Sequence, residues 1–155
     1  MRRDRHRLSR RVAGVAAAAS AVAACSSAPA SDVDPAAYRA QVDTICRDAL
    51  ADQALLAEPA DATGVAEFAL AVAAGLEAEA ELLRAVEPPA DLAADHRALI
   101  RNTDDQARRW TALASTTPDD TAAFGVIQTE ILELGLGRDD LAQEMDLPGC
   151  RRTSG

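Results

Sequence analysis

The sequence predicts an all-α protein, an up-down-up-down four-helix bundle, on three observations. The chain is rich in alanine and leucine and also contains glutamate and arginine, all of which favour helices. Apolar residues recur every three or four positions in four separate stretches, which is the spacing of one buried helix face. Prolines and short polar segments separate these stretches, and connections this short force neighbouring helices to run antiparallel.

The first helix is expected to begin at Asp34-Pro35 and to end near Glu58-Pro59. Asp34 can cap the helix, and proline suits the first helical position because its missing N–H loses no hydrogen bond there. The predicted buried face is apolar and consists of Tyr38, Val42, Ile45, Ala49 and Leu56.

The second helix is expected to run from about Thr63 to Pro88-Pro89, which cannot continue a helix. Its predicted buried face holds one polar residue, Glu79. The other members of that face are Phe68, Val72, Leu76, Leu83 and Val86.

The third helix is expected to start at the same prolines, with Asp91 in its first turn, and to end near Ser115. Two polar residues, Thr103 and Gln106, fall on its inward stripe. Because buried polar groups need partners, we expect both at the edge of the stripe, with a small polar cavity as the alternative. The rest of the stripe is Leu92, His96, Leu99, Trp110 and Leu113.

The fourth helix is expected to start at Thr117-Pro118-Asp119-Asp120, which offers a cap, a first-turn proline and an acidic first turn. It is expected to end at Leu147-Pro148-Gly149, with Asp139-Asp140 on a solvated face. All four helices are expected to be about 23 to 29 residues long. The predicted buried face of the fourth helix consists of Phe124, Ile127, Ile131, Leu134, Leu141 and Met145.

The first 24 residues have the features of a secretory signal peptide. Met1 to Arg11 is basic, and Val12 to Ala24 is an uncharged run that is too short to span a bilayer as a helix. The export route stays open, because Ser9-Arg10-Arg11 is similar to a twin-arginine signal but the residues after it fit that motif poorly.

The segment Val22-Ala23-Ala24-Cys25 resembles the lipobox of bacterial lipoproteins. The resemblance implies that Cys25 is modified with diacylglycerol and becomes the first residue after cleavage. It therefore implies a lipid-anchored protein on the extracytoplasmic face of the bacterial cell membrane; the alternative is an ordinary secretory signal with an incidental cysteine. The chain is expected to comprise a signal peptide (1–24), the lipidated cysteine and a flexible tether (25–33), the four-helix bundle (34–150) and a tail (151–155).

The charge of the exported part excludes one class of partner. The whole chain has a net charge of −9 and residues 1–24 carry six arginines and one aspartate, net +5, so residues 25–155 carry −9 − 5 = −14. Such a surface repels phosphate backbones, and no nucleic-acid partner is expected. It also repels anionic headgroups, so membrane attachment has to come from the anchor on Cys25.

Cys46 and Cys150 remain once Cys25 carries lipid, and disulfides persist outside the cytoplasm. In an antiparallel bundle the fourth helix ends where the first begins, so the two cysteines can meet. Cys46 lies about three turns into its helix, so either the chain after Leu147 folds back or the fourth helix stops short. We expect a structural Cys46–Cys150 disulfide rather than a redox pair, because there is no closely spaced CxxC arrangement.

The chain resembles a group of small exported or lipid-anchored helical proteins of actinobacteria. Three segments carry the resemblance: the first-helix run from Tyr38 to Cys46, the double-proline corner from Glu87 to Leu92, and Leu147-Pro148-Gly149-Cys150. It implies the fold and the location and adds no activity.

No catalytic or metal-binding pattern stands out. His96 is the only histidine of the exported part, and the residue three positions before it is Ala93, so the Glu-x-x-His spacing of di-iron bundles is absent. One histidine and scattered serines make no catalytic triad, and no calcium-loop motif occurs. We expect a core or boundary histidine, no enzyme activity, no metal and no cofactor.

Two functions remain. The first is a non-enzymatic interaction module that binds another envelope protein or a cell-wall component. The second is a carrier of a small apolar ligand or haem, with His96 or Tyr38 as contacts and the space between Phe68, Trp110 and Phe124 as the place for an apolar ligand. An exposed apolar groove over a solid core favours the module, and a sizeable cavity favours the carrier.

Overall fold

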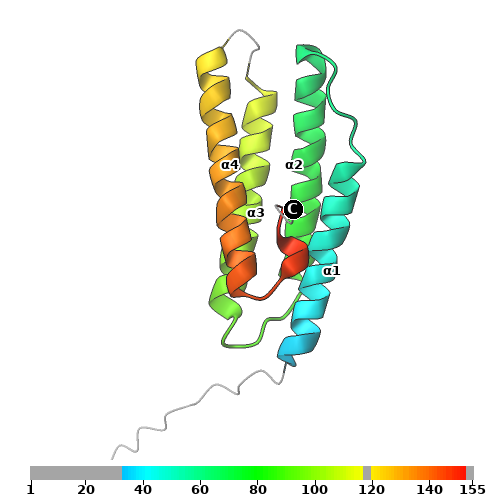
Figure 1. The fold of residues 1–155 in the computed structure, drawn as a ribbon, viewed down its shortest axis with the longest axis vertical. Coiled ribbons are helices and arrows are strands. Elements are labelled where there is room, and N and C mark those ends of the chain that lie inside the picture. Colours follow the sequence, from blue (N-terminus) through cyan, green and yellow to red (C-terminus); the bar gives the residue numbers. More distant parts are fainter. Residues whose placement is uncertain (1–32, 117–119, 153–155) are drawn as a thin grey trace, which may run out of the picture.

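The structure, a computed structural model, describes residues 33–116 and 120–152 and is shown in Figure 1. Among the described residues the only regular secondary structure is helical, with no strand, which confirms the all-α class and the number of helices. No described helix is both long enough and apolar enough to cross a membrane. The signal peptide, Cys25 and nearly all of the tether lie outside the described residues. The helices are α1 (Pro35–Ala54), α2 (Ala62–Arg84), α3 (Ala93–Ala114) and α4 (Thr121–Glu144), followed by a 3₁₀ turn, η1 (Pro148–Cys150).

Helix α1 begins where the sequence predicts and ends earlier. The Asp34 carboxylate accepts a hydrogen bond from the Ala36 N–H at 3.0 Å, and Pro35 is the first helical residue. The helix stops at Ala54, four residues before Glu58, so it is 20 residues long and shorter than expected. Proline disfavours helical geometry in the residue before it, and Leu55, which is 83% exposed, has little packing to extend the helix.

The starts of α3 and α4 also differ from the sequence prediction. Asp91 lies before α3 and Asp95 is the acidic residue of its first turn. In α4 the cap is Asp120, whose carboxylate accepts from the Ala123 N–H at 3.0 Å, and the prediction of a start at Thr117 is wrong. An aspartate directly before the helix satisfies one of its free N–H groups, so no earlier cap is needed.

Successive helices run in opposite directions, and they form an open rather than a closed bundle (Figure 1). Helix α2 packs on α3, α3 on α4 and α1 on α2, but the backbones of α1 and α4 do not pack on each other, although the Arg138 side chain of α4 reaches α1 at Cys46. The segment containing η1, red in Figure 1, lies between α1 and α4 and contacts both. A non-helical segment therefore takes the place of direct α1–α4 packing.

A tight turn after α4 sends the chain back along the bundle. Asp146 adopts φ 59°, a left-handed conformation that usually falls to glycine or asparagine at this position. The Leu147 N–H then bonds to the Ala142 carbonyl at 2.8 Å, and the Asp146 N–H bonds to the Gln143 carbonyl at 3.2 Å. This is the Schellman arrangement, and it places Leu147 in the core with no exposed surface.

The reversed segment reaches Cys46 and confirms the predicted Cys46–Cys150 disulfide. Of the two routes considered from the sequence, folding back is the one observed. Gly149 lies against α1, and its N–H bonds to the Asp43 carboxylate. A Cβ at position 149 would lie 2.7 Å from the Asp43 carbonyl oxygen, so only glycine fits there.

The core is distributed unevenly along the bundle. We use the name disulfide half for residues 35–46, 79–103 and 138–152, and open half for residues 56–76 and 106–136. Eleven buried residues form one continuous cluster in the disulfide half, including Tyr38, Leu99 and Leu147. The buried cluster toward the open half has only three members, namely Val72, Leu76 and Ala107.

Candidate binding groove

The interior of the disulfide half contains a buried arginine. Arg138 of α4 has no exposed surface, and its guanidinium forms an ion pair with Glu79 of α2, which is 3% exposed. Its Nη1 also donates to the Thr103 hydroxyl at 3.1 Å, and its Nε donates to the Cys150 carbonyl at 3.1 Å. Its Nη2 lies 3.4 Å from Cys46 Sγ. Every guanidinium nitrogen has a partner, which is the condition under which a charge tolerates burial.

This network was not predicted from the sequence, although one signal pointed to it. Glu79 is the single polar residue of the α2 face, and a buried carboxylate needs a buried donor. The expectation that Thr103 and Gln106 lie at the stripe's edge is wrong, because both are fully buried. Thr103 donates to the Leu99 carbonyl at 3.0 Å and accepts from Arg138, whereas Gln106 donates to the Asn102 side chain at 2.6 Å.

Asp139 is the second correction in α4. It was expected on a solvated face but is 8% exposed, and its carboxylate accepts from the Arg152 N–H at 2.8 Å. Burial, followed by the nearby charge of Arg138, lowers the pKa of Arg152 to about 10. The reversed C-terminal segment thus covers a cluster of charges and is itself held by them.

The structure brings together the two residues proposed as ligand contacts. Tyr38 Oη lies 2.9 Å from His96 Nδ1, and both side chains are buried, at 2% and 3% exposure. Burial raises the pKa of Tyr38 to about 12. Burial also lowers the pKa of His96, against a smaller opposite effect of a hydrogen bond to the backbone of Leu83. The neutral imidazole accepts from the tyrosine hydroxyl, so this pair bonds internally; its role as a ligand contact stays a prediction.

The described residues contain no group of three or more histidine, cysteine, aspartate or glutamate side chains placed to hold a metal ion. Candidate sites therefore come from the hollows of the bundle.

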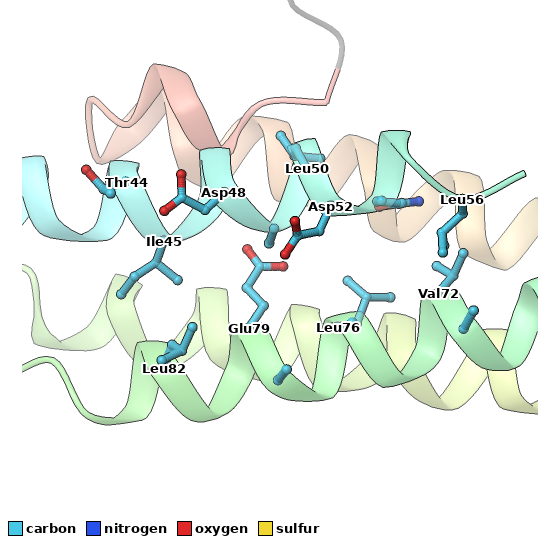
Figure 2. A pocket seen from close by; sticks show the side chains of 15 residues that line it. Thr44, Ile45, Asp48, Leu50, Asp52, Leu56, Val72, Leu76, Glu79 and Leu82 are labelled. Carbon is cyan, nitrogen blue, oxygen red and sulfur yellow. The ribbon is translucent and has the colours of Figure 1, made fainter.

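One hollow of about 260 Å³ lies between α1 and α2 (Figure 2). Ile45, Leu56, Val72 and Leu76 line it, and Glu79 points from α2 toward α1, as Figure 2 shows. Because the Glu79 carboxylate is already engaged by Arg138, this hollow offers an apolar lining without a free buried charge at that position.

A second hollow of about 360 Å³ lies in the open half, and we name it the open groove. Helix α3 contributes Trp110 and Leu113, and the rings of Trp110 and Phe68 meet edge to face with centroids 6.0 Å apart. The remaining apolar lining comes from α2, the loop before it and α4, namely Val65, Pro59, Phe124, Ile131 and Leu132. The three aromatic residues singled out from the sequence therefore do lie around one hollow.

Helix α4 leaves large apolar side chains uncovered. Leu132, which lines the groove, is 64% exposed, and Val126 and Leu136, which lie outside the lining, are 59% and 53% exposed. The predicted buried face of α4 is only partly covered in its first half, where Phe124, Ile127, Ile131 and Leu134 are half-buried and none is fully buried. The reason is the missing α1–α4 packing, because a helix face is buried only where another element covers it.

The lining of the open groove is uncharged, and acidic residues adjoin it. Glu58, Glu67 and Glu133 are exposed and are the sequence neighbours of the lining residues Pro59, Phe68 and Leu132. Arg152 lines a neighbouring hollow that shares Phe68 with the groove, and Glu79 and Asp139 lie close enough to offset its charge. Arg109 of α3 is paired with Glu130 at 3.3 Å.

Comparison with protein-family models, with curated proteins and with solved structures finds no match to this chain. The functional argument therefore rests on the residues and geometry described above.

Proposed function

We propose that this protein is a lipid-anchored, non-enzymatic interaction module on the extracytoplasmic face of the bacterial cell membrane, and that its open groove receives another protein of the cell envelope. The anchor is Cys25, and the tether up to residue 33 holds the bundle at the membrane surface.

One observation carries the proposal: an apolar groove stays uncovered in the open half while the disulfide half is sealed. Leu132 is 64% exposed in this groove, beside the partly buried rings of Phe68, Trp110 and Phe124. Exposed apolar surface of this kind marks interaction sites in soluble domains. The absence of a catalytic constellation in the sequence agrees with a binding role.

Site-specific photo-crosslinking in the producing cells tests the proposal. A photoreactive amino acid is placed at Leu132, in the groove, or at Leu70, which is 52% exposed on α2 and lies outside the groove lining. We expect a discrete protein adduct from position 132 and none from position 70. No adduct at 132, or equal adducts at both positions, contradicts the proposed function.

The anchor has its own test. The Cys25→Ser variant should leave the membrane fraction or remain unprocessed, because serine carries no thiol for diacylglycerol. A variant that is cut at the same place and stays fully membrane-bound contradicts the lipid anchor.

A carrier of a small apolar ligand is the second candidate. The volume of the open groove, about 360 Å³, supports it because this volume is large enough for a small molecule. The haem form of this candidate has less support, since His96 Nδ1 is bonded to Tyr38 away from the groove. Native mass spectrometry of the protein purified from its producing cells distinguishes the carrier by a retained small molecule.

A further inference from the structure

We propose that the open groove binds a cationic amphipathic α-helix belonging to a partner protein of the cell envelope. This inference rests on the proposed function and specifies the chemistry of the occupant. Three properties of the groove carry it: its shape, its lining and the charge around it.

The shape is that of a missing helix. The backbones of α2 and α4 do not pack against each other, although the side chains of Glu79 and Arg138 meet in the disulfide half, and both helices pack against α3, which lies between them. In the disulfide half the segment around η1 covers the corresponding space, and in the open half nothing described covers it. From Phe124 to Leu132 the groove wall formed by α4 measures about 12 Å at the helical rise, so it accommodates about two turns of an incoming helix.

The lining calls for an apolar stripe on that helix. Phe68, Trp110 and Phe124 form the interior of the groove, and Leu132 extends one wall outward. Helices that bind such grooves insert apolar side chains at i, i+3, i+4 and i+7 and leave their polar face in water. A small apolar molecule would leave Leu132 exposed, whereas a helix covers it.

The negative charge around the groove indicates that the residues beside the apolar stripe of the bound helix are basic. Three exposed glutamates, Glu58, Glu67 and Glu133, directly adjoin lining residues of the groove in the sequence, and the part of the chain after residue 24 carries a net charge of −14. Arginine or lysine beside the apolar stripe complements this charge and accelerates association. A second copy of the protein carries the same −14 and is repelled, as is a surface of anionic lipids.

Trp110 provides the readout, because it is the only tryptophan of the chain and lies in the groove. The processed protein, reconstituted in zwitterionic nanodiscs, is titrated with three helical peptides of about 16 residues, a length that spans the groove. One has a leucine stripe with arginine flanks, the second has the same stripe with glutamate flanks, and the third has the arginine composition with a scrambled stripe.

We expect saturable quenching or a spectral shift of Trp110 with the arginine-flanked stripe peptide, and binding at least about tenfold weaker with the other two. Leu132→Gln should weaken the binding about tenfold or more, and Leu70→Gln, the matched control, should leave it unchanged. Raising the salt concentration should weaken it further, because attraction between exposed charges is screened.

Equal binding of the arginine and glutamate peptides, no binding at millimolar peptide, or equal binding by the Leu132→Gln and Leu70→Gln variants overturns the proposal. A concentration series of the protein alone, without nanodiscs or peptide, tests for self-association. Self-association that is lost in the Leu132→Gln variant would mean that a second copy of the protein, and not a partner helix, occupies the groove. If the photo-crosslink at position 132 forms in cells while the arginine peptide fails to bind, the interaction module stands and the cationic helix falls.

Discussion

The two halves of the bundle contain the same kind of helices and differ in what covers them. In the disulfide half the reversed C-terminal segment covers the space between α1 and α4, and a disulfide, a buried ion pair and a Schellman turn hold it there. In the open half α2, α3 and α4 have no such cover, and Leu132 of α4 is 64% exposed in the groove between them. One short segment, rather than direct packing of all four helices, therefore closes this bundle. Substitutions in the disulfide half are expected to lower stability, and substitutions in the open half are expected to weaken binding.

The largest effect is expected from removing the disulfide. Cys46 and Cys150 are 104 residues apart, so the bond restricts nearly the whole described chain in the unfolded state. The Cys46→Ala, Cys150→Ala double variant should lose about 4–5 kcal/mol of unfolding free energy in the chain-entropy account, measured by urea denaturation. A loss below about 1 kcal/mol would mean that the C-terminal segment holds the half together without its covalent bond.

The next largest effect is expected from the buried ion pair. Arg138→Met leaves the Glu79 carboxylate buried without its partner and should cost about 3–5 kcal/mol. The Arg138→Met, Glu79→Leu double variant should recover most of that loss, since no charge is left unpaired. Arg109→Met, which removes the partly exposed pair with Glu130, is the matched control and should cost less than about 1 kcal/mol. Equal losses at the two sites would remove the contrast between buried and exposed pairs.

A smaller effect is expected from pH at the Tyr38–His96 pair. Burial lowers the pKa of His96 below 6.5, so below that pH the unfolded state binds a proton that the folded state does not. Stability should therefore fall as the pH drops from 7 to 5, and His96→Gln should flatten this slope in denaturation experiments. An unchanged slope in the variant would assign the pH dependence to other groups.

Tyr38 offers a direct check of the same pair, because it is the only tyrosine of the chain. Its tyrosinate absorbance should appear with a midpoint near pH 12 in the folded protein, against 10.0 for an exposed tyrosine. A folded-state midpoint near 10 would show that the pair is open to solvent.

The smallest effect on stability is expected in the open half. Leu132→Gln should change the unfolding free energy by less than about 0.5 kcal/mol, as should Leu70→Gln, because both side chains are more than half exposed. In contrast, Leu99→Ala in the disulfide half removes a fully buried side chain and should cost about 2–5 kcal/mol. A large loss at Leu132 would mean that the groove is core rather than binding surface.

The positions of the helices could be predicted from the sequence more accurately than which helix faces are covered by other elements. The buried stripe of α3 follows from the helical spacing of its residues. The disulfide follows from the two cysteines that remain once Cys25 is assigned to the lipid anchor. The burial of Arg138 and Asp139 could not be predicted, since it depends on where the chain turns at Asp146 after α4. The exposure of the α4 leucines depends on the same event, because periodicity reports a face and not what lies against it.

The aromatic site shows the same limit. Phe68, Trp110 and Phe124 were placed together from their stripes, and they do line one hollow. Whether that hollow is an enclosed cavity or an open groove depends on the missing α1–α4 packing, which the sequence does not express in any local pattern.

Hydrogen–deuterium exchange along α4 tests most directly the claim that one half is sealed and the other receives a helix, because this single helix runs through both. Without peptide, the amides of residues 127–136 should exchange much faster than those of residues 139–145. Addition of the arginine-flanked peptide should slow exchange at 127–136 and leave 139–145 unchanged. Equal protection along the helix, or peptide protection confined to the disulfide half, would contradict the account.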